Sequence, residues 1–139
     1  MRIRTILTFA QQAVQFPYSK AVSFPPALFL FTSLKELELT YSCLDSLPEE
    51  LCALVQLRLI DLRWNRIRSV HANLSKLVLL ETLLLTENEL RELPDSFASL
   101  RSLSCLDVAH NSLTALPPSL AECGQLRQLS IEFNRIERT

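Results

Sequence analysis

With 139 residues and a hydrophobic content of 48%, the chain can bury the core of one domain. Its formal net charge of −1 at pH 7 gives no electrostatic reason to expect nucleic acid or an anionic membrane as the main ligand. Its four cysteines show no C-x-x-C spacing, which excludes the common zinc and redox motifs and favours reduced thiols. They are Cys43, Cys52, Cys105 and Cys123.

The N-terminal ten residues carry no repeat and no export signal. The segment is positively charged, but its apolar stretch is short and is interrupted by Thr and Gln, which is too weak for a secretory signal. The next apolar run, Pro26–Phe31, is far shorter than a membrane span, so no integral membrane segment is expected. We interpret residues 1–10 as a non-repeat segment and predict a cytoplasmic protein.

From residue 34 onward, the chain repeats one pattern every 23 residues. Each copy opens with a leucine that is followed by apolar residues three and five positions later. The openings are Leu34-x-x-Leu37-x-Leu39, Leu57-x-x-Ile60-x-Leu62, Leu80-x-x-Leu83-x-Leu85, Leu103-x-x-Leu106-x-Val108 and Leu126-x-x-Leu129-x-Ile131. Alternating apolar residues predict one short strand per copy, and an unbroken period predicts that these strands stack in parallel.

A polar residue follows each predicted strand by three positions. It is Ser42 in the first copy and then Asn65, Asn88, Asn111 and Asn134. An asparagine amide offers donors and an acceptor to backbone groups that a tight inward turn would leave unpaired. We therefore predict a buried asparagine ladder, with a looser turn at Ser42.

The second half of a copy predicts a short helix. Leu47-Pro48-x-x-Leu51-x-x-Leu54 recurs around Pro94 and Pro117, with apolar residues at a spacing of three. That spacing suits one or two turns of 3-10 or α-helix, and proline is tolerated at the start of such a turn. One copy has His71 in place of proline, so we expect its helical segment to be less rigid.

One further period can be recognised towards the N-terminus. Shifted by 23 residues, Leu47, Pro48 and Leu51 map onto Phe24, Pro25 and Leu28. We interpret residues 11–33 as a degenerate repeat, and residues 34–139 as four full repeats and a fifth, truncated one. The missing half of the last copy favours a fragment of a longer array.

The block LxxLxLxxNxLxxLPxxLxxLxx resembles the Ras-group intracellular leucine-rich repeat proteins, and Asn88 to Pro94 carry its most diagnostic part. Ser42 and His71 depart from the pattern. The resemblance implies an α/β repeat solenoid, in which a parallel sheet lines the concave side of an arc and short helical or 3-10 segments form the convex side. It also implies a protein partner, such as a small GTPase or a phosphatase or kinase complex, in intracellular signalling.

No arrangement of residues predicts catalysis, a cofactor or a metal site. His110 is expected beside the sheet and His71 on the convex side, so the two histidines fall on different faces. Cys105 and His110 share a coil, but most of a strand should separate their side chains. Gly124 is the only glycine, which excludes a glycine-rich phosphate loop. We therefore expect a non-enzymatic domain.

The predicted concave face supplies the candidate partner-binding residues. They form columns running across the coils: Glu38, Asp61, Leu84 and Asp107; then Arg63; then Tyr41, Trp64, Glu87, His110 and Phe133. Aromatic residues and arginine dominate interface hot spots, which favours a binding patch centred on Asp61, Arg63 and Trp64. The alternative is structural: large residues at this rim would pack over the preceding coil and shield the asparagines.

Two other functional interpretations stay open at the level of sequence. The chain could be the recognition segment of a larger multidomain enzyme, such as a kinase or ubiquitin ligase, whose catalytic part lies elsewhere. It could also be a truncated product without independent function.

Overall fold

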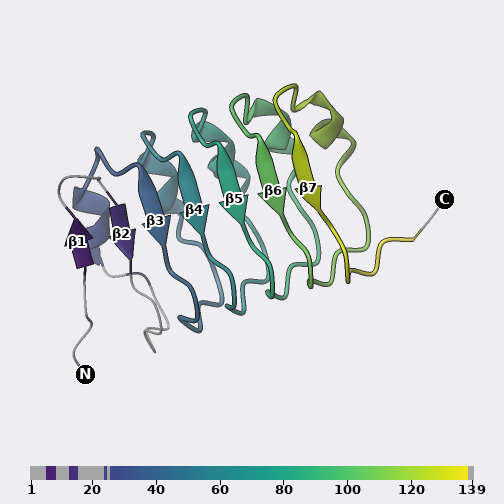
Figure 1. The fold of residues 1–139 in the computed structure, drawn as a ribbon, viewed down its shortest axis with the longest axis horizontal. Coiled ribbons are helices and arrows are strands. Elements are labelled where there is room, and N and C mark those ends of the chain that lie inside the picture. Colours follow the sequence, from purple (N-terminus) through teal and green to yellow (C-terminus); the bar gives the residue numbers. More distant parts are fainter. Residues whose placement is uncertain (1–5, 9–12, 16–23, 25, 138–139) are drawn as a thin grey trace.

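The computed structural model describes residues 6–8, 13–15, 24 and 26–137. Most of the segment 1–10 and the middle of the segment 11–33 lie outside the described residues, as do residues 138–139. The described elements form a repeating solenoid. Its strands lie side by side in chain order, and a layer of short 3-10 helices lies behind them (Figure 1).

The strands form one seven-stranded sheet. They are β1 (Ile6–Thr8), β2 (Ala13–Gln15), β3 (Glu36–Glu38), β4 (Leu59–Asp61), β5 (Thr82–Leu84), β6 (Cys105–Asp107) and β7 (Gln128–Ser130). All neighbours from β2 to β7 pair in parallel, with the repeat period as their register; Leu37, for example, lies opposite Ile60. The predicted parallel solenoid is confirmed.

The core runs through the inside of every coil. The central residues of four successive strands, Leu37, Ile60, Leu83 and Leu106, are fully buried. The strands are shorter than the alternation predicted, because the next inward residue lies just beyond each strand end. Hydrogen bonding continues there: the Leu39 N–H donates to the Asp61 carbonyl oxygen at 2.8 Å.

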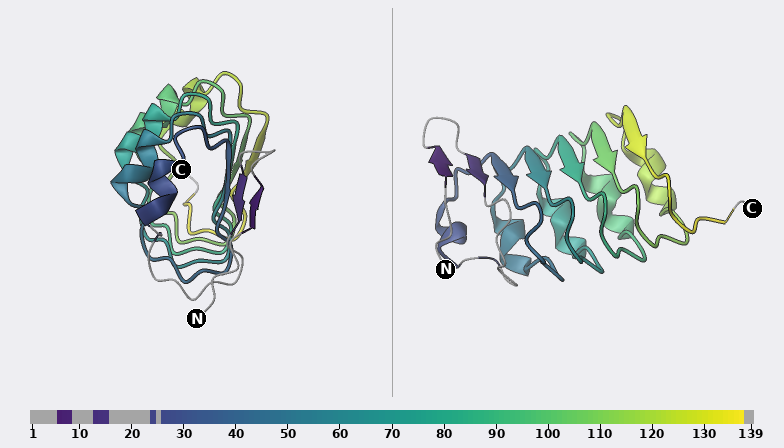
Figure 2. Two further views of the ribbon diagram at one scale, coloured as in Figure 1. Left: turned by 90° about the vertical axis from the view of Figure 1, so that its left-hand side faces the viewer. Right: turned by 60° about the horizontal axis from the view of Figure 1, so that its bottom comes forward.

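Short 3-10 helices form the convex layer opposite the sheet (Figure 2). They are η1 (Pro26–Leu30), η2 (Glu49–Ala53), η3 (Ala72–Lys76), η4 (Asp95–Ser99) and η5 (Pro118–Glu122). Pro48, Pro94 and Pro117 precede η2, η4 and η5 in an extended conformation. Leu51 and Phe97 are fully buried at the equivalent helix position. The apolar spacing of three therefore predicted the convex side correctly.

At η3 a side chain compensates for the missing proline. His71 has the same extended conformation, and its Nδ1 accepts a hydrogen bond from the Asn73 N–H at 3.0 Å. An N-terminal cap of this kind satisfies one of the free N–H groups at a helix start. This cap was not predicted from the sequence.

Three buried asparagines, Asn65, Asn88 and Asn111, tie neighbouring coils together, as the predicted ladder required, and Asn134 in the last coil is partly buried. Asn88 Nδ2 donates to the carbonyl oxygens of Leu62 and Leu85 at 3.0 Å, and its Oδ1 accepts from the Ile67 N–H at 3.0 Å. Asn111 repeats these bonds one coil later. Each amide therefore bonds to backbone groups of two coils at the point where the chain leaves the sheet.

The coil with Ser42 turns differently. Ser42 is buried, and its hydroxyl donates to the Thr40 carbonyl oxygen within the same coil. Its N–H donates to Asn65 Oδ1 at 3.0 Å, so the next asparagine also serves this turn. Tyr41 and Cys43 both take a positive φ, of 53° and 55°, whereas each asparagine-containing coil has one such residue among those described.

The N-terminal edge of the sheet contains a strand that the sequence did not predict. β1 lies inside the segment interpreted as non-repeat, and it pairs antiparallel with β2, which lies in the segment interpreted as a degenerate repeat. β2 and η1 lie one repeat period before β3 and η2.

At the opposite edge, β7 is less covered than the other strands. Leu129, its central residue, is 37% exposed, whereas Leu106 in β6 is fully buried. Leu113 and Leu120 stay buried in the preceding coil. No described helix combines the length and apolar character that a membrane crossing requires.

Candidate functional site

The outer face of the sheet presents two residues from each strand. Because the central residue points into the core, the residues on either side of it point outward. In β5 these are Thr82 and Leu84, both partly exposed. Of these two outward columns on the strands, only the second, which contains Leu84, was predicted as part of the site. The first column, which strict alternation would have identified, comprises Glu36, Leu59, Thr82, Cys105 and Gln128.

Asp61 and Arg63, at the centre of the predicted binding patch, form an ion pair with each other. The Asp61 carboxylate accepts from the Arg63 backbone N–H at 3.1 Å, from Nε at 2.9 Å and from Nη2 at 2.7 Å. Asp61 is only 5% exposed, so it is not accessible to a partner in the way expected of a binding residue. The guanidinium folds back over the carboxylate and covers it.

The field of the sheet face is acidic around this pair. The hydrogen bond to Asp61 raises the pKa of Arg63 above its usual value, and the charges of Asp61, Asp107 and Glu38 act in the same direction. Partial burial opposes this shift. Arg63 is therefore held as a cation beside Asp61.

The rim residues share an unusual backbone conformation. Tyr41, Trp64, Glu87, His110 and Phe133 all have a positive φ, between 51° and 61°. Non-glycine residues rarely adopt this left-handed conformation. Here each residue precedes the turn that carries the next polar ladder residue inward, and the Trp64 N–H still bonds to the Thr86 carbonyl oxygen at 3.0 Å.

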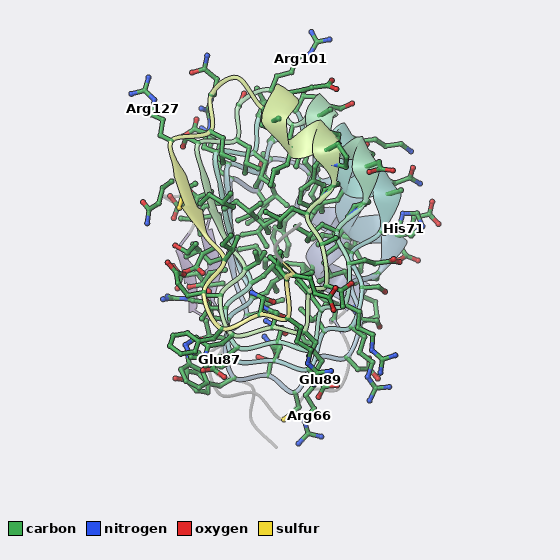
Figure 3. The ribbon with its side chains drawn as sticks, turned by 90° about the vertical axis from the view of Figure 1, so that its right-hand side faces the viewer. Arg66, His71, Glu87, Glu89, Arg101 and Arg127 are labelled. Atoms are coloured by element: carbon green, nitrogen blue, oxygen red, sulfur yellow. The ribbon has the colours of Figure 1, made fainter. Side chains whose placement is uncertain are left out.

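The rim side chains stack along the solenoid in two pairs. The Tyr41 and Trp64 rings are stacked with centroids 5.3 Å apart, and the His110 and Phe133 rings with centroids 4.2 Å apart. Glu87 occupies the coil between the pairs, and its Oε1 lies 3.4 Å from His110 Nδ1. Figure 3 shows Glu87 beyond the C-terminal ends of the strands and Arg127 at their opposite, N-terminal ends.

Both interpretations of the rim describe part of this arrangement. The side chains pack on one another, as the structural interpretation expected. They also stay accessible, since Trp64 is 45% and Phe133 is 73% exposed. The rim therefore consists of side chains that stack in two pairs and keep an accessible surface.

The other chemically active side chains do not converge. His71 lies on the 3-10 helix side of the molecule and Glu87 on the sheet side (Figure 3). The described residues contain no group of three His, Cys, Asp or Glu side chains that could hold a metal ion. Burial raises the pKa of the Cys52, Cys105 and Cys123 thiols, which disfavours the reactive thiolate.

Comparisons with solved structures place this fold among repeat proteins. The Leptospira interrogans leucine-rich repeat protein LIC12759 is 25% identical, with a TM-score of 0.78 over 80% of this chain and 28% of that one. The ectodomain of the Arabidopsis thaliana receptor kinase GASSHO1/SCHENGEN3, solved in complex with CASPARIAN STRIP INTEGRITY FACTOR 2, is 29% identical. Its TM-score is 0.74, over 81% of this chain and 14% of that one.

This chain matches a larger share of a third solved structure. The ectodomain of the Arabidopsis thaliana receptor kinase SOBIR1 is 28% identical, with a TM-score of 0.72 over 88% of this chain and 65% of that one. This chain thus spans less than two thirds of each of these three structures.

The family comparison covers nearly the whole sequence. Residues 13–137 match the family model described as a leucine-rich repeat region. No curated protein matches the chain in sequence. Domains with this fold are typically non-catalytic modules that mediate protein–protein interaction. The match agrees with the repeats, the parallel sheet and the asparagine ladder of this chain. The chain belongs to the leucine-rich repeat family.

Proposed function

We propose that this domain is a non-enzymatic module that binds a protein partner on its concave sheet and the adjoining rim. The observation that carries the proposal is the stacked Tyr41–Trp64 pair, which is fixed by its packing and is still accessible. A rigid aromatic surface loses little conformational entropy on binding, and tryptophan and tyrosine are enriched at interface hot spots. The acidic residues beside the rim add charge that can select and orient a partner.

The setting that we propose is cytoplasmic signalling, with a small GTPase or a phosphatase or kinase complex as the partner. Support comes from the 23-residue repeats with their Leu-Pro step, which resemble the Ras-group intracellular proteins. Cysteines without a metal or disulfide spacing are compatible with a reducing compartment.

A second candidate is the recognition segment of a larger, multidomain protein such as a kinase. The similarity to the ectodomains of the receptor kinases GASSHO1/SCHENGEN3 and SOBIR1 favours this alternative. It places the domain in a longer chain and leaves the proposed binding surface unchanged.

The proposal can be tested with a pair of equally exposed apolar positions. Trp64 is 45% exposed on the rim, and Val78 is 47% exposed in the turn after η3. A partner is captured from a cytosolic extract on the immobilised chain, identified by mass spectrometry and purified. Its affinity is then measured for the wild type and for the Trp64→Ala and Val78→Ala variants.

We expect Trp64→Ala to weaken binding at least tenfold and Val78→Ala to leave it within twofold. A tenfold loss corresponds to about 1.4 kcal/mol, which exceeds the cost of about 1 kcal/mol that most interface residues do not reach when they are truncated. Equal affinities of the two variants would show that the rim takes no part in recognition.

A further inference from the structure

The edge of the sheet at β7 has backbone N–H groups without partners. After each strand from β3 to β6, the N–H groups of the first and third residues donate to carbonyl oxygens of the next coil, at distances between 2.7 and 3.2 Å. After β6, for example, Val108 and His110 each donate at 2.9 Å. The equivalent residues after β7 are Ile131 and Phe133, and their N–H groups have no hydrogen-bond partner among the described residues. The edge of β7 therefore lacks the strand that these donors require.

The same edge leaves apolar side chains of the inner face partly uncovered. Leu129 is 37% exposed, and Ile131, which packs against the core, is partly exposed as well. Their equivalents in the preceding coil, Leu106 and Val108, are fully buried. Because these side chains lie beside the unpaired N–H groups, one added strand would both pair the backbone and cover the apolar residues.

The edge carries none of the features with which sheets usually prevent such pairing. Those features include charged residues, prolines and covering loops or helices. Residues 128–131 contain neither a charged residue nor a proline. Among the described elements, β7 contacts β6 and nothing lies across its other edge. β7 is thus a template for an extended strand.

β7 is complementary to a second copy of itself. When two copies pair antiparallel about Ser130, Leu129 of one copy lies opposite Ile131 of the other. This register matches residues whose free backbone groups face the edge, and it joins their apolar side chains on the inner face. On the outer face it places Gln128 opposite Glu132, where the amide can donate to the carboxylate.

The charges at the two ends of β7 favour the same arrangement. Arg127 precedes the strand and Glu132 follows it, and both are exposed. Neither side chain has an ion pair among the described residues. A two-fold axis at the middle of β7 brings Arg127 of each copy beside Glu132 of the other, whereas parallel pairing of the two strands would bring like charges together.

We propose that the chain forms a two-fold symmetric dimer in which β7 of one copy pairs antiparallel with β7 of the other, centred on Ser130. The two sheets join into one continuous sheet, and both concave faces lie on the same side of it. The dimer therefore presents two copies of the concave face. This interface is separate from the Tyr41–Trp64 pair, so the proposal does not rest on the proposed function.

Self-association of the full chain is measured by analytical ultracentrifugation over a hundredfold range of concentration. We expect a reversible monomer–dimer equilibrium for the wild type. Leu129→Lys places a charge on the inner face of the edge and should weaken dimerisation at least tenfold. Val78→Lys is the control, because Val78 is 47% exposed in the turn after η3, and it should leave dimerisation within twofold.

Disulfide formation tests the register and does not depend on the folding of Leu129→Lys. The variants also carry Cys43→Ser and Cys105→Ser, which remove the two accessible cysteines. Ser130→Cys should form a covalent dimer under mild oxidation, because the two copies of this residue lie opposite each other with Cα atoms about 4.5 Å apart. Gln128→Cys should not, since its counterpart lies about 13 Å further along the partner strand.

A wild-type chain that stays monomeric over the whole range would overturn the proposal, as would equal dimerisation of Leu129→Lys and Val78→Lys. Polymers that grow with concentration would indicate head-to-tail pairing and exclude the two-fold dimer. A covalent dimer from Gln128→Cys but none from Ser130→Cys would also contradict it. If the chain is monomeric and a captured protein partner protects the β7 amides from hydrogen exchange, the edge binds a strand of that partner and not a second copy.

Discussion

The side chain of Asn88 connects two coils, because its amide forms hydrogen bonds with backbone groups in both. It donates to Leu62 and Leu85 and accepts from Ile67. Glu87, just before it, takes a φ of 58°, an uncommon conformation for a non-glycine residue. The two residues act together at this turn. Glu87 turns the chain inward, and the Asn88 amide satisfies the backbone groups that the turn would leave unpaired.

Replacement of Asn88 with alanine should therefore destabilise the fold. Each buried group left without a partner costs about 1–3 kcal/mol. We expect the urea denaturation midpoint of Asn88→Ala to fall accordingly. The neighbouring exposed residue serves as the control, since Glu89→Ala should change the free energy of unfolding by less than about 0.5 kcal/mol. An unchanged midpoint for Asn88→Ala would refute the role of the ladder.

At the scale of elements, strands of equal length differ in how well they are protected. β5 has a strand on both sides, and its backbone bonds to β4 and β6. β7 is the last strand of the sheet and pairs with β6. Its central Leu129 is 37% exposed, whereas Leu83 in β5 is fully buried. Local opening is easier where fewer apolar contacts must be broken.

Amide hydrogen exchange should record this difference. We expect the amides of residues 129–133 to exchange at least tenfold faster than those of residues 83–86, and the amides of residues 106–108 to resemble the latter. The measurement is made on the monomeric chain, because association through the exposed edge would protect β7. Equal protection of the two segments in a monomer would contradict this ranking of the strands.

At the scale of the whole molecule, the repeat period predicted the architecture because one spacing sets every register. The spacing of Leu37, Ile60 and Leu83 required parallel strands with a common inward face, and the sheet has them. The position of Asn88 after the strand likewise implied a buried ladder. Such features follow from a pattern that each coil must repeat in order to stack on the next.

The surface could be predicted less well, because it depends on side-chain conformations that the period does not constrain. Asp61 was expected to be accessible, yet Arg63 folds over it. The rim residues were expected either to pack or to bind, and stacking lets Trp64 pack on Tyr41 and stay half-exposed. β1 lies outside the repeat, so the period could not reveal its pairing with β2.

The central claim is that a protein partner docks on the concave sheet, and site-specific photo-crosslinking tests it most directly. A photoreactive residue is placed either at Leu84, in the middle of the concave sheet, or at Ser99, at the end of η4 on the convex side of the same coil. We predict that the partner crosslinks to position 84, that excess unlabelled wild-type chain abolishes this product, and that position 99 gives none. A specific crosslink at position 99, without one at position 84, would contradict binding on the concave face.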